Sequence, residues 1–348
     1  MDEVKDKKIA LIGGAGFIGH NLALELVKLG AKVTIFDAFS VNNLLNQIQK
    51  QDLEQNDELY GLFLRERLSL LSEAGIRIEV ADFSDRFASA KALDEDFDIA
   101  YNLAAVSHAS RSNKQPDYAL SNSLIPFVNV INELANRKTR LVFLSSSTVY
   151  GNFEKDKVDE GDRCNPFGIY ATLKYCSEMI LREMGTNIDF NYSVVRPSAL
   201  YGERCISRRV SQIFLENAVA GVENNFYGDA DETLDFTYIK DLVQGLILAG
   251  VKEEARGEVF NITFGNARKV LTLVDILREY FPEVQVNVKD RNQATPIRGT
   301  LSNKKAKDLL GFSPAFKLED GYKHYIEWYV EFVSKNNLKL IERPQINE

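Results

Sequence analysis

The feature that most constrains the fold is a short apolar run that passes directly into a glycine-rich turn. Residues 8–12 (Lys-Ile-Ala-Leu-Ile) have the composition of a buried strand, and Gly13, Gly16 and Gly19 follow at intervals of three residues. Glycines at a strand-to-helix turn allow the backbone to approach a pyrophosphate closely, and the helix N-terminus offers free N–H donors to it. The pattern therefore predicts a dinucleotide-binding turn. A glycine turn without a ligand is the alternative, because Gly-x-x-Gly-x-x-Gly departs from the usual Gly-x-Gly-x-x-Gly.

The second predicted strand supports a dinucleotide. Residues 32–36 end in Asp37, 18 residues after Gly19, where a carboxylate can accept hydrogen bonds from an adenosine ribose. A 2′-phosphate would meet that negative charge, so Asp37 predicts NAD rather than NADP. Asp82, which follows the strand-like residues 77–80, is a candidate adenine contact or an ordinary strand-end Asp.

Strand-like runs alternate with helical patterns through the first half of the chain. We expect strands at 8–12, 32–36, 77–80, 99–103, 140–145 and 192–196, with helices such as 17–29 and 124–136 between them. This alternation predicts an α/β fold with a Rossmann-type, doubly wound parallel sheet. Residues 41–74 exceed a simple crossover and predict an additional helical excursion.

The character of the chain changes after about Gly202, where the predicted elements become shorter and mixed. We therefore expect an NAD-binding domain over residues 1–202 that includes the catalytic residues. Residues 203–348 are expected to form mainly a smaller mixed α/β lobe that binds substrate, with room for some segments to return to the sheet.

Composition argues against several classes of partner. The 348 residues include 42 Lys and Arg against 50 Asp and Glu, and the net charge is −8. Without a basic cluster longer than two residues, nucleic acids and anionic membranes are disfavoured as partners. No membrane-spanning run or signal peptide is recognisable, and Cys164, Cys176 and Cys205 are too scattered for a disulfide framework or zinc site. We expect a cytoplasmic protein with reduced thiols and no metal.

The second informative pattern is Tyr170 and Lys174, which share one face of a predicted helix. A nearby ammonium and the positive nicotinamide of NAD⁺ would lower the pKa of the phenol, so Tyr170 is a candidate general base toward a substrate hydroxyl. A hydroxyl cluster at 145–148 follows the strand at 140–144, at the sheet edge where ligands bind. A surface helix pair and an ordinary Ser/Thr turn are the alternatives.

These patterns occur in an order that resembles the extended short-chain dehydrogenase/reductase family, in its NAD-dependent nucleotide-sugar epimerase/dehydratase branch (UDP-glucose 4-epimerase-like proteins). The resemblance covers residues 8–330. The matching stretches are 13–19 (Gly-Gly-Ala-Gly-Phe-Ile-Gly), 102–105 (Asn-Leu-Ala-Ala), 145–151 (Ser-Ser-Ser-Thr-Val-Tyr-Gly), 170–174 (Tyr-x-x-x-Lys), 196–202 (Arg-Pro…Tyr-Gly), 227–229 (Tyr-Gly-Asp), 235–239 (Asp-Phe-Thr-Tyr-Ile) and 309–314 (Leu-Leu-Gly-Phe-Ser-Pro).

The resemblance implies roles for individual residues. Tyr170 would be the general base, Lys174 would hold the nicotinamide ribose, and Ser146, with Ser147 as its alternative, would hydrogen-bond the reacting oxygen. Asn122 would buttress the active-site helix. The implied NAD-binding residues are Gly13, Gly16, Phe17, Ile18, Gly19, Asp37, Asp82, Phe83, Leu103, Ala104, Ala105, Asn122, Tyr170, Lys174 and Pro197. A homodimer through a four-helix bundle, built from helices near 117–136 and 170–184, is also implied.

Departures from the family pattern limit the substrate prediction. Ala199 and Leu234 stand where relatives have an Asn and an Arg that contact the diphosphate of a nucleotide sugar. The loss of a charge-assisted contact costs about 1.5–3 kcal/mol unless another group replaces it. The candidate replacements are Arg204, Arg208, Arg209 and Arg298, with Arg209 and Arg298 as the preferred pair. The candidate substrate-binding residues are Ser107, His108, Ser147, Thr148, Arg204, Arg209 and Arg298.

The leading hypothesis from the sequence is NAD-dependent oxidation at C4 of a nucleotide-linked sugar, as a 4-epimerase that acts through a 4-keto intermediate. Dehydration is disfavoured, because Ser147 and Thr148 stand where 4,6-dehydratases carry an acid. A C4 dehydrogenase, a 4-keto-sugar reductase and a decarboxylase of the same family are alternatives. A non-catalytic NAD-binding regulatory protein is an alternative from another class.

Overall fold

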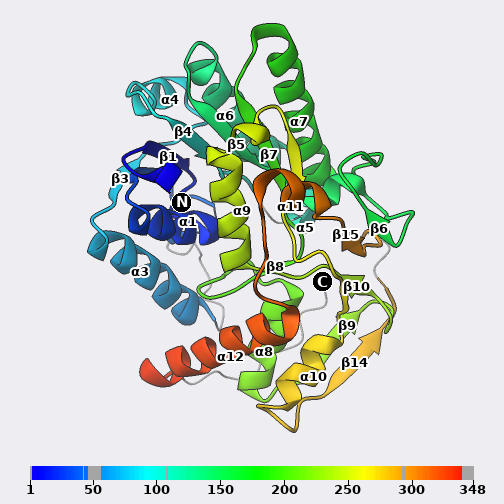
Figure 1. Cartoon of the computed structure of the whole chain (residues 1–348). Coiled ribbons are helices and arrows are strands. Elements are labelled where there is room, and N and C mark those ends of the chain that lie inside the picture. The colour runs from blue at the N-terminus through cyan, green and yellow to red at the C-terminus, as the bar shows by residue number, and fades with distance from the viewer. Residues whose placement is uncertain (1, 42, 46–55, 107–108, 292–294, 339–348) are drawn as a thin grey trace.

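A parallel sheet forms the centre of the molecule (Figure 1). The computed structural model describes residues 2–41, 43–45, 56–106, 109–291 and 295–338. Within this described part, seven strands pair in the order β12-β7-β5-β4-β1-β2-β3. Their bounds are β1 (Lys8–Ile12), β2 (Lys32–Asp37), β3 (Arg77–Val80), β4 (Ile99–Asn102), β5 (Arg140–Leu144), β7 (Tyr192–Arg196) and β12 (Val259–Asn261). From β1, the chain adds β2 and β3 on one side of the sheet and then continues with β4 on the other side. In α/β sheets, ligands bind at such a switch point, at the carboxyl ends of the strands.

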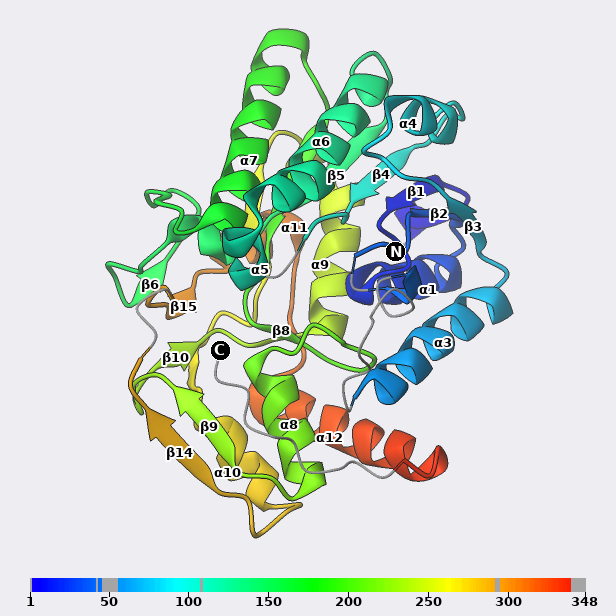
Figure 2. The ribbon, with the colours of Figure 1, turned by 180° about the vertical axis from the view of Figure 1, so that it is seen from behind.

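Helices cover both faces of the sheet (Figure 1, Figure 2). Ile9 and Leu11 of β1 belong to a core shared with α1 (Phe17–Lys28), α3 (Asp57–Glu73) and α9 (Ile239–Val251). Ala10 and Ile12 belong to a second core, shared with α4 (Arg86–Ala92), α6 (Pro116–Leu134) and α7 (Ile169–Ile188). Alternate residues of one strand thus enter opposite cores, which explains why the central strands read as continuous apolar runs.

A smaller lobe lies below the sheet in Figure 1. It contains the parallel pair β9 (Asn224–Tyr227) and β14 (Val286–Lys289) together with α8 (Val210–Ala220), α10 (Thr272–Arg278) and α12 (Leu318–Lys335). The remaining elements are 3-10 helices at Asp2–Val4, Ser147–Tyr150 and Glu253–Ala255, helices α5 (Ala109–Lys114) and α11 (Lys304–Leu310), and short strands β6 (Lys157–Val158), β8 (Leu200–Tyr201), β10 (Thr233–Leu234), β11 (Thr237–Tyr238), β13 (Arg268–Lys269) and β15 (Thr300–Leu301).

The predicted fold class is confirmed, and the element boundaries differ only locally. The expected strands end within one residue of the observed ones, whereas the helix expected at 124–136 begins at Pro116, where proline is well placed in the first turn. The excursion at 41–74 contains α3, and residues 42 and 46–55 lie outside the described residues. Segments after residue 203 do return to the sheet layers, as β12 and α9.

Helix α7 is anchored to the sheet by a buried ion pair. Arg196 of β7 donates from Nε to Glu178 Oε1 at 3.0 Å, and both side chains are only 5% exposed. Glu178 also accepts a hydrogen bond from the Ser145 hydroxyl at the end of β5. The contact sets the position of α7 relative to the carboxyl edge of the sheet. Among the described residues, no helix is both long and apolar enough to cross a membrane.

Candidate active site

A cavity of about 590 Å³ lies at the carboxyl edge of the sheet and extends to the lobe. Its size falls within the range of about 300–1,000 Å³ that is usual for ligand sites. Every residue of the predicted NAD-binding set lines it, from the β1–α1 turn through the ends of β2, β4 and β7 to Tyr170 and Lys174. Segments far apart in the sequence therefore meet at one surface.

The β1–α1 turn has the shape that a pyrophosphate needs. Gly13 has φ of +76°, and a Cβ atom there would lie 2.8 Å from Ala104 Cα. At Gly19, a Cβ atom would lie 2.5 Å from the backbone of Gly14. Gly16 precedes α1 without a side-chain cap, so no side chain of the cap residue competes for the N–H groups of the first turn. The turn therefore fits a dinucleotide phosphate.

Asp37 lines the end of the cavity where the sequence predicts the adenosine ribose. One carboxylate oxygen accepts a hydrogen bond from Phe39 N–H at 2.7 Å and the other accepts one from Ala15 N–H at 2.9 Å. Burial raises the pKa of Asp37, while these two N–H groups and the charge of Arg67 oppose that rise. Each oxygen retains lone pairs, so the carboxylate can still accept bonds from ribose hydroxyls.

Ser146 and Tyr170 meet at the reacting end. The Ser146 hydroxyl oxygen accepts bonds from the Thr148 N–H at 3.2 Å and the Thr148 hydroxyl at 3.0 Å. Burial raises the pKa of Tyr170, whereas the charge of Arg209, a hydrogen bond with Ser146 and the charge of Arg298 lower it. Tyr170 and Ser146 are thus adjacent, as the proposed proton chemistry requires.

Lys174 points toward the sheet rather than along α7. Its ammonium donates a hydrogen bond to the Leu144 carbonyl at 2.6 Å and lies 4.8 Å from the centre of the Phe143 ring. Burial lowers the pKa of Lys174 to about 8, and the charge of Glu178 opposes this shift. Among the described residues, the cations whose charges lower the pKa of Tyr170 are Arg209 and Arg298, and Lys174, which the sequence predicts for this role, is not one of them.

The substrate end combines apolar walls with two arginines. Ala199 and Leu234 line the cavity without a polar side-chain group, and Arg209 and Arg298 line the same region. Burial and the charge of Arg209 together lower the pKa of Arg298 to about 10, although the charge of Glu232 opposes this shift. Among the described residues, Arg298 Nε is a buried donor without a hydrogen-bond partner. This donor set suits an anion.

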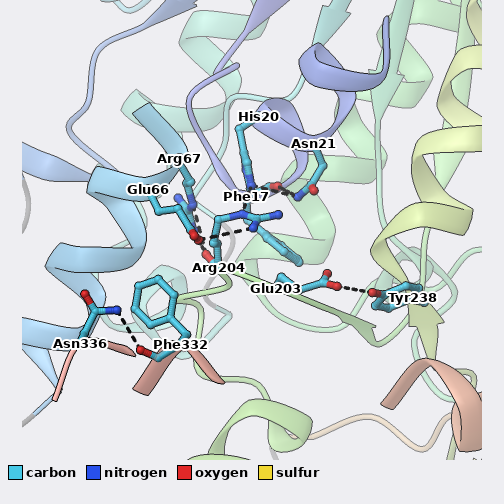
Figure 3. A network of polar contacts seen from close by, with 10 residues as sticks. All are labelled: Phe17, His20, Asn21, Glu66, Arg67, Glu203, Arg204, Tyr238, Phe332 and Asn336. Carbon is cyan, nitrogen blue, oxygen red and sulfur yellow. Dashed lines mark hydrogen bonds and ion pairs between the residues drawn. The ribbon is translucent and has the colours of Figure 1, made fainter. Parts of the chain in front are cut away.

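The remaining predicted substrate residues have different outcomes. Ser147 and Thr148 line the cavity, whereas Ser107 and His108 lie outside the described residues. The prediction for Arg204 is wrong, because it does not line the cavity. Figure 3 shows its guanidinium engaged below α1, where it donates to His20 Nε2 at 3.0 Å and to Glu66 at 3.4 Å. Arg208 also lies outside the cavity lining.

Two charged lining residues, Arg67 and Glu232, have no counterpart in the sequence prediction. Arg67 lies in α3 on the buried face that carries Tyr60, Leu64 and Leu71. In the sequence, a charged residue that occupies a position on the apolar face of an amphipathic helix indicates a buried charged group, which is often functional. Glu232 lies in the loop between β9 and β10 with Asp229 and Asp231, and nothing in the sequence separates it from exposed acids.

Comparisons with known proteins agree with this geometry. The model of the NAD dependent epimerase/dehydratase family matches residues 9–263. The UDP-glucuronate 4-epimerase 1 of Arabidopsis thaliana is 28% identical over 94% of this chain and 78% of that protein. A putative UDP-glucose 4-epimerase of Methanocaldococcus jannaschii is 24% identical over 92% of this chain and 97% of that protein. The structure of a UDP-glucuronic acid 4-epimerase from Bacillus cereus, with UDP-glucuronic acid and NAD, has a TM-score of 0.81 at 22% identity, over 93% of this chain and 99% of that one. At this identity, the structural likeness shows the fold.

The glycine turn generates a prediction on cofactor binding. Gly13→Ala is expected to weaken NAD⁺ binding by at least about tenfold, because the new Cβ would push against Ala104 and deform the cleft. Gly75→Ala is the matched control, since Gly75 has a similar φ of +67° and nothing within 4 Å of a new Cβ. Fluorescence titration with NAD⁺ measures both affinities. Equal NAD⁺ affinities for the two variants would contradict the assignment.

Proposed function

Because this chain belongs to the NAD-dependent epimerase/dehydratase family, we propose that it oxidises C4 of a nucleotide-linked sugar and returns the hydride to the opposite face, as a 4-epimerase. The observation that carries the proposal is the contact between Ser146 and Tyr170 in the cavity whose other end holds the glycine turn and Asp37. The 4-epimerase names of the relatives from A. thaliana and M. jannaschii support it.

Each catalytic side chain has a defined task in this reaction. NAD⁺, when bound, supplies a hydride acceptor that gives the hydride back. Tyr170, as phenolate, takes the proton of the C4 hydroxyl while the C4–H bond breaks, and it returns that proton when the ketone is reduced. Ser146 donates a hydrogen bond to the same oxygen, which becomes the ketone oxygen. Lys174 is proposed to hold the nicotinamide ribose.

The lobe side of the cavity is proposed to bind the diphosphate of the sugar nucleotide. Arg209 and Arg298 replace the two polar groups that are missing at Ala199 and Leu234, and the partnerless Nε of Arg298 supplies a donor for the anion. Ser147 and Thr148 line the cavity next to Ser146 and are proposed to contact the sugar. Contact of Ser107 and His108 with the substrate stays a prediction from the sequence.

Epimerisation is favoured over dehydration by the acids of the cavity. Among the described lining residues, the acids are Asp37 and Asp82 at the cofactor end and Glu232 on the lobe. Glu232 lies 3.9 Å from Arg291, and its charge also acts on Arg298. The position after Ser147 carries Thr148, so no carboxylate stands there for the elimination of water.

We also propose a homodimer and a cytoplasmic location. Helices α6 and α7 lie side by side (Figure 2). Their exposed apolar side chains include Leu120, Ile125 and Met179, which are 41%, 40% and 43% exposed. Pairing of these two helices with those of a second copy would cover this surface in a four-helix bundle. The free thiols of the three cysteines are consistent with a reducing compartment.

The first test of this function is Tyr170→Phe. The variant is expected to bind NAD⁺ as the wild type does and to lose about a hundred- to ten-thousandfold in turnover, because the ring keeps its shape and loses the proton carrier. Nuclear magnetic resonance of a panel of nucleotide sugars measures C4 epimer formation. Stoichiometric NADH without an epimer would indicate a dehydrogenase, and release of CO₂ would indicate a decarboxylase. Equal turnover by variant and wild type would show that Tyr170 is not the base, and the absence of turnover in both would indicate a non-catalytic NAD-binding protein.

The arginine beside the phenol generates a pH prediction. Because the charge of Arg209 lowers the pKa of Tyr170, Arg209→Met raises that pKa, and a larger fraction of the base is protonated at neutral pH. The acid limb of the pH profile of kcat/KM is therefore expected to move to higher pH, with activity recovering in alkaline solution. Arg208→Met, a charge removal outside the cavity lining, is the control. An acid limb that stays in place in both variants would refute this role.

The dimer proposal has its own test. Leu120→Glu is expected to give a monomer in sedimentation equilibrium, because a charge would be buried in the bundle. Leu309→Glu is the matched control, since Leu309 is 42% exposed on α11, outside the proposed bundle. A monomeric wild type, or equal disruption by both substitutions, would show that α6 and α7 do not form the interface.

A further inference from the structure

Helix α3 contains a buried arginine, Arg67, whose side chain lines the cavity. Arg67 is 1% exposed and lines the cavity together with Asp37. Its Nε donates a hydrogen bond to the Arg204 carbonyl at 3.1 Å, and its Nη2 donates to the same oxygen (Figure 3). Its third nitrogen, Nη1, is buried and has no hydrogen-bond partner among the described residues.

A buried donor without a partner requires an explanation, because desolvation without a compensating hydrogen bond is unfavourable, and more so for a charged group. Burial lowers the pKa of Arg67 to about 10, which leaves the guanidinium charged at neutral pH. The charge of Asp37 acts on Arg67, and the charge of Arg67 acts on Asp37. The carboxylate assigned to the ribose thus has a cation beside it.

Arg204, whose carbonyl accepts both hydrogen bonds from Arg67, is itself linked to two helices. Arg204, in the loop after β8, also donates to His20 Nε2 at 3.0 Å and to Glu66 of α3 at 3.4 Å. His20 lies in α1, and its Nδ1 contacts the Gly16 carbonyl at 2.9 Å. Burial holds the pKa of His20 well below its usual range, so the ring is neutral, donates from Nδ1 and accepts at Nε2. The helix of the glycine turn and α3 are thereby linked.

We propose that Arg67 is a second determinant of cofactor binding, in which Nη1 donates a hydrogen bond to the adenosine ribose while Asp37 accepts one from it. The ligand chemistry is a ribose diol with an acceptor oxygen toward α3. For a cofactor with a 2′-phosphate, the two residues act with opposite sign, because Arg67 attracts the phosphate and Asp37 repels it. Helix α3 then has a function, which is to place this cation at the cavity.

Calorimetric titration with NAD⁺ and NADP⁺, after removal of co-purified nucleotide, tests the proposal. Arg67→Gln, which keeps a donor for the Arg204 carbonyl, is expected to weaken NAD⁺ binding by about tenfold or more. Asp37→Asn is expected to raise the affinity for NADP⁺ relative to NAD⁺, and the double variant Asp37→Asn/Arg67→Gln is expected to lose that gain. Arg65→Gln is the matched control, because Arg65 is an exposed arginine of the same helix.

The conservative variant separates a binding role from a structural one. In the Asp37→Asn background, Arg67→Lys retains the cation and is expected to keep the affinity for NADP⁺ that Arg67→Gln loses. Equal NADP⁺ affinities of Asp37→Asn with and without Arg67→Gln would overturn the proposal. If the Arg67→Gln variant does not fold, the Asp37→Asn/Arg67→Lys variant tests the proposal instead. An NADP⁺ affinity of this double variant that is no higher than that of the wild type would overturn the proposal. Because these are binding measurements, their failure is distinct from a failure of the proposed epimerase activity.

Discussion

The ion pair between Arg196 of β7 and Glu178 of α7 is the contact on which the geometry of the active site depends. Tyr170, Lys174 and Glu178 follow one another at single helical turns, so the residue that anchors α7 stands on the same face as the two residues that line the cavity. Both charged side chains are 5% exposed. Removing one partner of such a pair leaves a buried charge and costs about 3–5 kcal/mol, so α7 has one strongly preferred position on the sheet.

Each end of the cavity has side chains of both charge signs. At the cofactor end, Asp37 faces the charge of Arg67, and at the lobe end Arg298 faces the charges of Arg209 and Glu232. A mixed set of charges can bind a ligand that carries both hydroxyl donors and phosphate acceptors, which a set of one sign would not do. In this arrangement the lobe supplies the cations that act on the Tyr170 phenol, while Lys174 is held against the Leu144 carbonyl.

Much of the fold could be predicted from local signals. Buried strands such as β1 and β5 are continuous apolar runs, and the turn at Gly13 requires a backbone conformation that glycine adopts readily. The apolar pattern alone marks only the second half of α6, because the first turns of this helix are largely polar, whereas the family resemblance places its start near residue 117, one residue from Pro116. The return of α9 and β12 to the sheet was foreseen only in general terms, since sheet order depends on contacts between distant segments.

The amino-acid sequence by itself determined the strand–helix alternation, the dinucleotide turn, Asp37 and the pair of Tyr170 and Lys174, because each of these is encoded by residues close together in the chain. Only the tertiary structure decided which arginines enter the cavity. Arg204 and Arg209 are separated by four residues, yet the first is held by His20 and Glu66 and the second lines the cavity. Arg67 reaches the same cavity from a distant helix. Such choices depend on packing partners far away in the sequence, which no local pattern records.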